Sequence, residues 1–172
     1  MSQTSVNTAF NPANDPRKFR TALSRYATGI TVITAASPEG LIGITANSFA
    51  SISLDPALVM WSPDKKSSRH DLFVGADAFA IHVLSADQRA ICDGFVRSKH
   101  AFDGVEHHLN AHGVPIIDGC LSVFECTRFA THDAGDHTLV LGAVEKAQER
   151  SGEGLVFANG LFTTLRFEAS AA

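Results

Sequence analysis

The sequence predicts a mainly β protein, an antiparallel β-barrel with a few short helices at its periphery. Short runs rich in β-branched residues recur along the chain, and turn residues separate them. Helical stretches are few and short, and they do not alternate regularly with the strands. This order disfavours a doubly wound parallel sheet and favours an antiparallel barrel. No internal repeat or interdomain linker divides the chain, so one domain is expected.

The first third of the chain predicts one helix and four strands. Asp15 can cap a helix and Pro16 suits its first position. Apolar residues follow at helical spacing, and Gly29 suits the C-terminal cap. Beyond it, strands are expected over residues 30–36, 41–48, 49–54 and 57–62, the first two joined by the turn S-P-E-G.

The rest of the chain predicts two more helices and several strands. Ser85 stands three residues before Gln88, which is the spacing of a capping box, so a helix is expected over residues 85–95. Residues 96–119 are expected to be irregular, because they contain glycine, proline and four histidines. The remaining elements are a helix over 65–74, a strand over 79–84, a hairpin of 121–130 and 137–147 around D-A-G-D, and strands over 155–157 and 161–167.

Length and composition indicate a soluble globular protein. The chain has 172 residues, of which 45% are hydrophobic, and this is enough for one domain with a core. The expected domain spans residues 15–168, between a disordered leader (1–14) and a short tail (169–172). The net charge is −4 and no basic run occurs, so nucleic-acid binding has no electrostatic support. No segment approaches the roughly 18 apolar residues of a membrane span.

Cysteine usage and the first residues point to the cytoplasm. Cys92, Cys120 and Cys126 form no C-x-x-C pair and are odd in number, which favours free thiols in a reducing compartment. The N-terminus lacks a basic region followed by an apolar run, so it does not resemble a secretory signal.

One polar segment stands out, because its side chains are unusual for a buried strand. Residues 43–56 read G-I-T-A-N-S-F-A-S-I-S-L-D-P, with many small hydroxyl and amide side chains. Such a strip leaves backbone N–H and C=O groups open to a flat polar ligand. The usual dinucleotide and Walker motifs are absent, so a nucleotide would have to bind on another scaffold. No serine or cysteine has the setting of a nucleophile, so hydrolysis has no support.

A second segment, S-P-D-K-K-S-S-R-H-D at residues 62–71, suits an anion. It follows an apolar strand and opens a predicted helix, whose first N–H groups attract negative charge. Two serine hydroxyls and three cations add to this. The sequence supports two interpretations about equally: a phosphate site, or a capped surface helix with solvated lysines.

The third segment, H-D-A-G-D-H at residues 132–137, leaves three alternatives. It can be a plain hairpin turn with surface charges. It can present His137 to a bound ligand. A metal site is the weakest alternative, because a tight hairpin points these side chains in different directions and no further ligand pattern follows. The motif H-H-L-N-A-H at residues 107–112 is expected on the surface.

Taken in order, six landmarks between Phe19 and Phe167 resemble the short flavin reductase family. They are F-R-x-x-L-x-x-Y-A-T-G-I-T-V-I-T, G-I-T-A-N-S-F-A-S-I-S-L-D-P-A-L-V, F-A-I-H-V-L, F-D-G-V, F-E-C and G-D-H-T-L-V-L-G-A-V. The resemblance implies an FMN-binding split barrel of antiparallel Greek-key type, usually a homodimer. It also implies that NADH or NADPH reduces FMN or FAD, and that reduced flavin leaves for a separate flavin-dependent oxygenase.

The same resemblance assigns site residues. His137 is the expected catalytic residue, placed near the nicotinamide. The expected flavin contacts are Ile44, Thr45, Ala46, Asn47 and Ser48 at the ring, Ala50 and Ser51 close by, Lys65, Lys66, Ser67 and Ser68 at the phosphate, Arg97 and Ser98 at the tail, and Asn159 and Gly160 in a late returning segment. No metal is expected. Two departures occur: His82 stands where the family often has asparagine, and Ala158-Asn159 stands where it often has an aromatic-basic pair.

These observations predict an NAD(P)H:flavin oxidoreductase. In hydride transfer the flavin and nicotinamide cofactors supply the reacting atoms themselves. A site without a catalytic acid–base pair is therefore compatible with this chemistry. The alternative function is a split-barrel protein that binds flavin without turnover. A third possibility within the same fold is a direct oxidase or an enzyme that reduces a different acceptor.

Overall fold

A computed structural model describes residues 8–165 of the chain. Residues 1–7 of the predicted leader and the whole predicted tail, 169–172, lie outside the described residues. The domain boundaries therefore stay a prediction.

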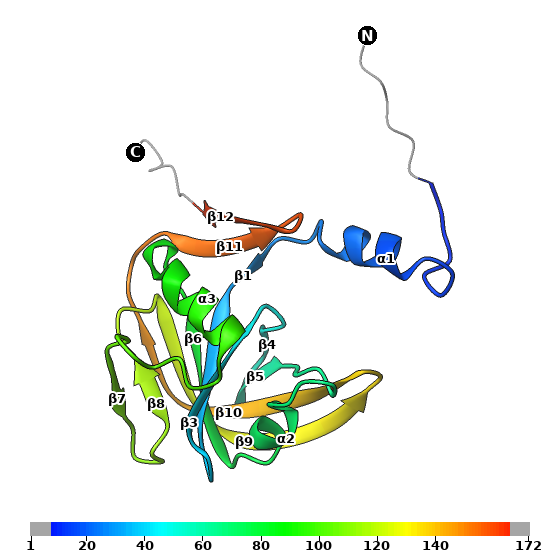
Figure 1. Ribbon diagram of the computed structural model, residues 1–172. Coiled ribbons are helices and arrows are strands. Elements are labelled where there is room, and N and C mark those ends of the chain that lie inside the picture. Colours follow the sequence, from blue (N-terminus) through cyan, green and yellow to red (C-terminus); the bar gives the residue numbers. More distant parts are fainter. Residues whose placement is uncertain (1–7, 166–172) are drawn as a thin grey trace.

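The described chain consists mainly of strands (Figure 1). The helices are α1 (Pro16–Leu23), α2 (His70–Val74) and α3 (Arg89–Arg97), with a 3₁₀ turn η1 (Ala86–Gln88) before α3. The strands are β1 (Thr28–Gly29), β2 (Thr31–Ser37), β3 (Gly40–Ala46), β4 (Ala50–Leu54), β5 (Ala57–Trp61), β6 (Ala78–Val83), β7 (His107–Leu109), β8 (Pro115–Ile117), β9 (Ser122–Ala134), β10 (His137–Glu149), β11 (Gly154–Ala158) and β12 (Leu161–Leu165).

A seven-stranded sheet forms the body of the molecule, in the order β3-β2-β6-β9-β10-β5-β4. Every pairing in it is antiparallel, which confirms the predicted mainly β, antiparallel fold. Strands β3 and β4 form its two edges. A smaller sheet, β1-β11-β12, lies at one end of the body, and the hairpin β7–β8 lies on one side (Figure 1).

The central strands β2 and β6 are buried on both faces, because a core cluster packs on each side. Val32 and Ala80 belong to the cluster beneath α3 and the β7–β8 hairpin. Ile33 and Ile81, their neighbours along the strands, belong to the cluster that contains Trp61 and the α2 residues. Successive side chains of a strand point to opposite faces, so alternate residues feed the two clusters. This double burial explains the continuous apolar runs of the sequence.

Three expectations about the elements were wrong. Helix α1 ends at Leu23 rather than at Gly29, because the chain then extends and Gly29 pairs with Val156 in β11. The helix expected over residues 65–74 begins only at His70, because the Asp64 carboxylate accepts the N–H of Lys66 and the Asp64 carbonyl accepts that of Ser67. The segment expected to be irregular, 96–119, contains the hairpin β7–β8.

Other local predictions are confirmed by hydrogen bonds. The Asp15 carboxylate accepts the N–H of Lys18 at 2.9 Å and so caps α1. Ser85 and Gln88 form the predicted capping box. The hairpin β9–β10 turns at Gly135, whose φ of 67° favours glycine. These signals are short in range, so the sequence alone could specify them.

All three cysteines are free and buried. Burial raises the pKa of Cys92, and it raises the pKa of Cys120 to about 11 and that of Cys126 to about 12.

Within residues 8–165, no helix is long and apolar enough to cross a membrane.

Gly43 lets helix α3 approach strand β3. A Cβ atom at this position would overlap the ring of Phe95, which is fully buried and packs edge-on against Phe102 at 4.9 Å between ring centroids. Because the added Cβ would force the ring out of its packed position, Gly43→Ala is expected to lower the free energy of unfolding by about 1–3 kcal/mol in urea titrations. The control is Gly29→Ala, since a Cβ there meets no atom within 4 Å. Equal effects of the two variants would contradict the packing argument.

Candidate active site

A cavity of about 520 Å³ lies where the end of β3, the loop after β5 and the end of α3 meet. His137, the first residue of β10, also lines it. The lining residues are Ile44, Thr45, Ala46, Asn47, Ser48, Trp61, Ser62, Pro63, Asp64, Ser67, Ser68, Arg69, Phe95, Val96 and His137. The cavity therefore joins all three segments that the sequence had singled out.

The strip from Ile44 to Ser48 forms one wall, and two of its hydroxyl groups hold neighbouring segments in place. The Thr45 hydroxyl donates to the carbonyl of Cys92 in α3 at 2.7 Å. The Ser48 hydroxyl donates to the Ser62 carbonyl at 3.2 Å and accepts the Ser62 N–H at 2.9 Å. Because β3 is an edge strand, alternate backbone groups face away from β2 and are open to a ligand. This wall therefore presents mainly backbone N–H and C=O groups to a ligand.

The loop of residues 62–69 forms the opposite wall. The cationic side chains of this loop point in different directions. The Lys65 ammonium contacts Asp133 and the Gly135 carbonyl, so it is turned toward the β9–β10 hairpin. Ser67 and Ser68 line the cavity. Neither Lys65 nor Lys66 is among the lining residues.

Arg69 connects three walls of the cavity. Its guanidinium donates to the carbonyls of Phe95 and Val96 at the C-terminal end of α3, the latter at 3.2 Å, and to that of Gly43 in β3 at 3.4 Å. A helix C-terminus carries partial negative charge, which repels an anion. Because the guanidinium covers these carbonyls, this wall presents positive charge instead. Partial burial lowers the pKa of Arg69, but an arginine remains charged in proteins.

His137 sits at a rigid corner of the cavity. The Lys65 N–H donates to the Asp136 carbonyl at 2.9 Å, and the Thr138 N–H donates to the Pro63 carbonyl at 3.1 Å. These two bonds fix the backbone on both sides of the histidine. Its Nδ1 lies 2.7 Å from the Asp136 carboxylate, and this contact lowers the pKa of Asp136. The Nε2 edge of the ring has no hydrogen bond to a residue within 8–165, so it is available to a ligand.

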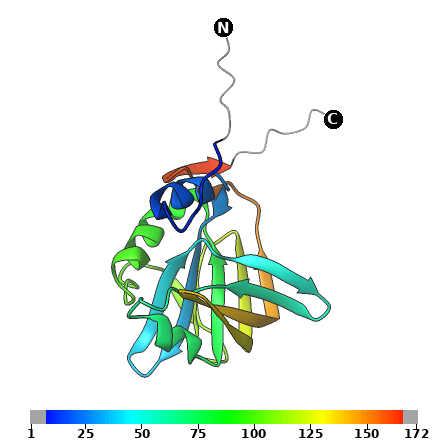
Figure 2. The same ribbon diagram turned by 90° about the vertical axis from the view of Figure 1, so that its right-hand side faces the viewer.

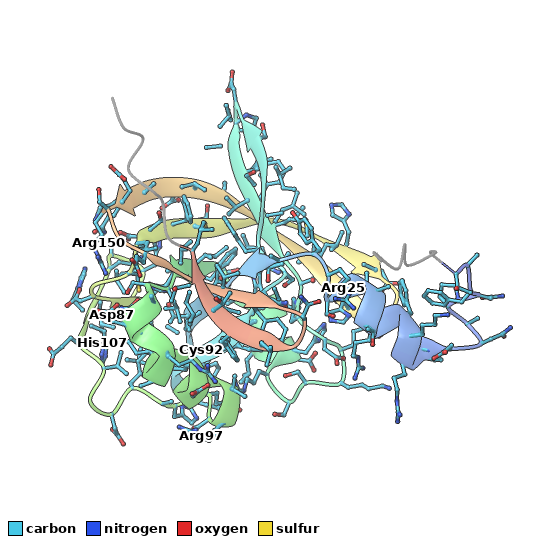
Figure 3. All side chains as sticks on the ribbon, turned by 90° about the horizontal axis from the view of Figure 1, so that it is seen from above. Arg25, Asp87, Cys92, Arg97, His107 and Arg150 are labelled. Carbon is cyan, nitrogen blue, oxygen red and sulfur yellow. The ribbon has the colours of Figure 1, made fainter. Side chains whose placement is uncertain are left out.

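The remaining predicted residues lie outside this cavity. Ala50 and Ser51 belong to β4, and Ser51 lines a separate apolar cavity beside Phe124. Arg97 and Ser98 follow Val96 at the exposed end of α3 (Figure 3). Asn159 and Gly160 form the β11–β12 turn, where the Asn159 N–H donates to the Ser24 carbonyl at 2.8 Å.

Sequence reasoning missed part of the cavity wall. Trp61 is fully buried, and its indole N–H has no partner in the described part of the chain. Phe95 and Val96 reach the cavity only because α3 folds across β3, and no local pattern announces such a long-range contact. Arg69 was counted among the three cations of the predicted anion segment, but it was not assigned as a flavin contact. No cluster of three or more His, Cys, Asp or Glu side chains in residues 8–165 could hold a metal ion.

Residues 23–166 match the flavin reductase like domain. The chain belongs to the flavin reductase-like family. This confirms the resemblance drawn from the six landmarks. Over 146 residues it is 56% identical to the FMN reductase (NADH) SmoA of Agrobacterium fabrum, an alignment that covers 85% of this chain and 84% of that protein. It is 38% identical over 136 residues to HsaB of Mycobacterium tuberculosis, a flavin-dependent monooxygenase reductase subunit, covering 78% and 73% of the two chains.

A solved structure extends the likeness to the whole fold of this flavin reductase-like protein. The NADH:FAD oxidoreductase of Streptomyces globisporus, in complex with NAD and FAD fragments, aligns with a TM-score of 0.85 and 33% identity. The alignment covers 96% of this chain and 100% of that one. The predicted split barrel is thereby confirmed.

Proposed function

We propose that this protein is an NADH-dependent flavin reductase that reduces FMN or FAD and supplies the reduced flavin to a separate oxygenase. The observation that carries the proposal is the cavity itself. A wall of backbone groups, two serine hydroxyls with a guanidinium, and one histidine converge on about 520 Å³. Relatives named as an NADH-dependent FMN reductase and as a monooxygenase reductase subunit support the same activity.

The cavity fits a flavin in size and in chemistry. Its volume lies within the range of roughly 300–1,000 Å³ that small-molecule sites occupy. The strip Ile44–Ser48 suits the edge of a flat heteroaromatic ring, which carries both donors and acceptors. Ser67, Ser68 and Arg69 suit the phosphate, because hydroxyl groups and a guanidinium both donate to anionic oxygens.

A bound flavin and nicotinamide supply the hydride chemistry themselves. The residues of this chain then have three tasks. The strip holds the flavin ring, and its N–H groups stabilise the negative charge that grows on the ring during reduction. His137 orients the hydride donor with its free Nε2 edge. Phe95 and Val96 cover one side and exclude water. No side chain needs to act as an acid or a base.

The direct test crosses NADH and NADPH with riboflavin, FMN and FAD in a steady-state assay. We expect NADH oxidation that depends on added flavin. Binding can be followed separately, because Trp61 is the only tryptophan of the chain and lines the cavity, so a bound flavin should quench its fluorescence. Quenching without NADH oxidation would instead favour the non-catalytic flavin-binding alternative.

His137→Ala is expected to impair use of the nicotinamide and to leave flavin affinity nearly unchanged. A lost hydrogen bond of about 1–3 kcal/mol corresponds to roughly a five- to hundredfold lower kcat/KM for NADH. Stopped-flow reduction of the flavin complex, together with a flavin titration, separates the two effects. His132→Ala is the matched control, because this exposed histidine of the same hairpin does not line the cavity. Normal reduction kinetics in the His137→Ala variant would show that His137 is an ordinary turn residue with no role at the nicotinamide.

We further propose a homodimer in the cytoplasm. The sheet edge at β4 and several exposed apolar side chains, among them Phe19, Leu54 and Leu161, support self-association. Three buried free thiols support a reducing compartment.

A further inference from the structure

A pair of side chains joins the first residue of helix α2 to the second residue of strand β10. Helix α2 lies beside the β9–β10 hairpin in both views (Figure 1, Figure 2). The His70 Nε2 lies 2.9 Å from the Thr138 hydroxyl, and the His70 Nδ1 lies 2.7 Å from the Asp71 carboxylate. Thr138 is 9% exposed and the His70 side chain is 14% exposed, so little water competes for the bond between them.

The Asp71 carboxylate decides the direction of these hydrogen bonds. A carboxylate only accepts, so the His70 Nδ1 carries the proton and donates it to Asp71. In a neutral imidazole the other nitrogen then accepts, and Nε2 takes the hydrogen bond of the Thr138 hydroxyl. Carboxylate, imidazole and hydroxyl follow each other as in a nucleophilic triad. Thr138 is buried and does not line the site cavity, however, so its hydroxyl is not placed to attack a substrate there.

The same bond attaches the far end of the loop of residues 62–69 to strand β10. At the near end of this loop, the Pro63 carbonyl accepts the Thr138 N–H at 3.1 Å. At the far end, His70 accepts the hydroxyl proton of the same threonine. Thr138 therefore holds both ends of the loop next to His137, its neighbour in the chain.

Two parts of the candidate site are connected in this way. Ser67 and Ser68 lie on the loop between the two attachment points, and both line the cavity together with His137. Neither His70 nor Thr138 lines it. The bond between these two residues therefore acts on the site only by fixing where the serines lie relative to His137.

We propose that His70 is a positioning residue for hydride transfer, because its bond to Thr138 fixes the spacing between the loop that binds the flavin phosphate and His137. This rests on the proposed function. Hydride transfer requires the two rings at near-attack distance, and a displacement of about 1 Å can slow a reaction about a hundredfold. Each cofactor is held by its own residues, so loss of the bond should slow the reaction step and change both affinities little.

Stopped-flow reduction of the flavin complex tests this role. Thr138→Val removes the hydroxyl and His70→Leu removes the imidazole. Each change is expected to lower the limiting reduction rate at saturating NADH about tenfold or more, whereas the dissociation constants of NADH and flavin should change less than about twofold. The double variant should be no slower than the slower single variant, because both changes remove the same bond. Thr138→Ser keeps the hydroxyl and should restore the rate.

Thr34→Val is the matched control. This buried threonine of β2 donates to the Pro115 carbonyl at 2.6 Å and does not line the cavity. Its loss should lower the free energy of unfolding and leave the reduction rate unchanged. An unchanged rate in Thr138→Val, an equal slowing in Thr34→Val, or a loss confined to NADH affinity overturns the proposal.

The bond itself is tested without turnover. Urea titrations of Thr138→Val, His70→Leu and the double variant form a double-mutant cycle, which should show a coupling of about five- to tenfold in the unfolding equilibrium constant. Absence of coupling overturns the proposal. Coupling in a protein whose natural form reduces no flavin would instead overturn the proposed function, and the role of His70 with it.

Discussion

Replacing Ser67 and Ser68 together by alanine is expected to weaken FMN binding about a hundredfold or more and to leave riboflavin binding nearly unchanged. Both serines line the cavity, and FMN carries a phosphate whereas riboflavin does not. A hydrogen bond to a charged group contributes about 1.5–3 kcal/mol, so two lost bonds amount to about two to four orders of magnitude in the dissociation constant. Titrations of Trp61 fluorescence with each flavin measure the difference.

Two controls make this result specific. Ser151→Ala changes an exposed serine that does not line the cavity and should affect neither flavin. The Ser67 hydroxyl also accepts the backbone N–H of Arg69 at 3.2 Å, so the double variant also removes one hydrogen bond within the loop. A disturbed loop would weaken riboflavin and FMN alike, and an equal loss for both flavins would remove the phosphate assignment.

Lowering the pH is expected to reduce the free energy of unfolding by about 3 kcal/mol, because His82 resists protonation in the folded protein. The imidazole is completely buried, its Nδ1–H donates to the Val32 carbonyl at 3.0 Å, and its Nε2 accepts the Ile117 N–H at 3.0 Å. Burial lowers the pKa of His82 from 6.5 to about 4, against smaller opposing effects of the Val32 carbonyl and Glu125, and His108 lowers it further. A proton on Nε2 would break the bond to Ile117.

The direction follows from proton linkage. The unfolded chain takes up the proton near pH 6.5, whereas the folded chain resists it until about pH 4. The stability is therefore complete above pH 6.5 and is lost as the pH falls toward 4. Urea titrations across this window should show the loss in the natural protein. His82→Asn and His82→Gln cannot titrate, so their unfolding free energies should fall less steeply. Parallel pH profiles would show that other groups cause the acid sensitivity.

Local signals in the sequence were enough to predict most of the strands and turns. The run I-T-V-I-T-A-A and the turn D-A-G-D specify β2 and the β9–β10 hairpin, because β-branched residues and a glycine with positive φ have strong intrinsic preferences. The boundary of α2 could not be predicted. Asp64 competes for the N–H groups of residues 66 and 67, and such competition is decided by geometry rather than by composition.

The candidate site was predictable where its residues are contiguous and not where tertiary contacts create it. The strip Ile44–Ser48 and the pair Ser67–Ser68 lie in the cavity as neighbours in sequence. The contact of Arg69 with the end of α3 joins residues 26 and 27 positions apart, and no sequence pattern encodes it. The direction of Lys65 toward Asp133 depends on the same long-range folding.

The buried cysteines have a consequence for the lifetime of the protein at work. Reduced flavin that meets oxygen produces hydrogen peroxide, so a flavin reductase operates next to a source of oxidant. Peroxide attacks thiolates, not thiols. With a pKa of about 11 for Cys120 and about 12 for Cys126, only about one thiol in ten thousand or fewer is ionised at neutral pH. The barrel thus holds its three thiols in a form that hydrogen peroxide oxidises slowly.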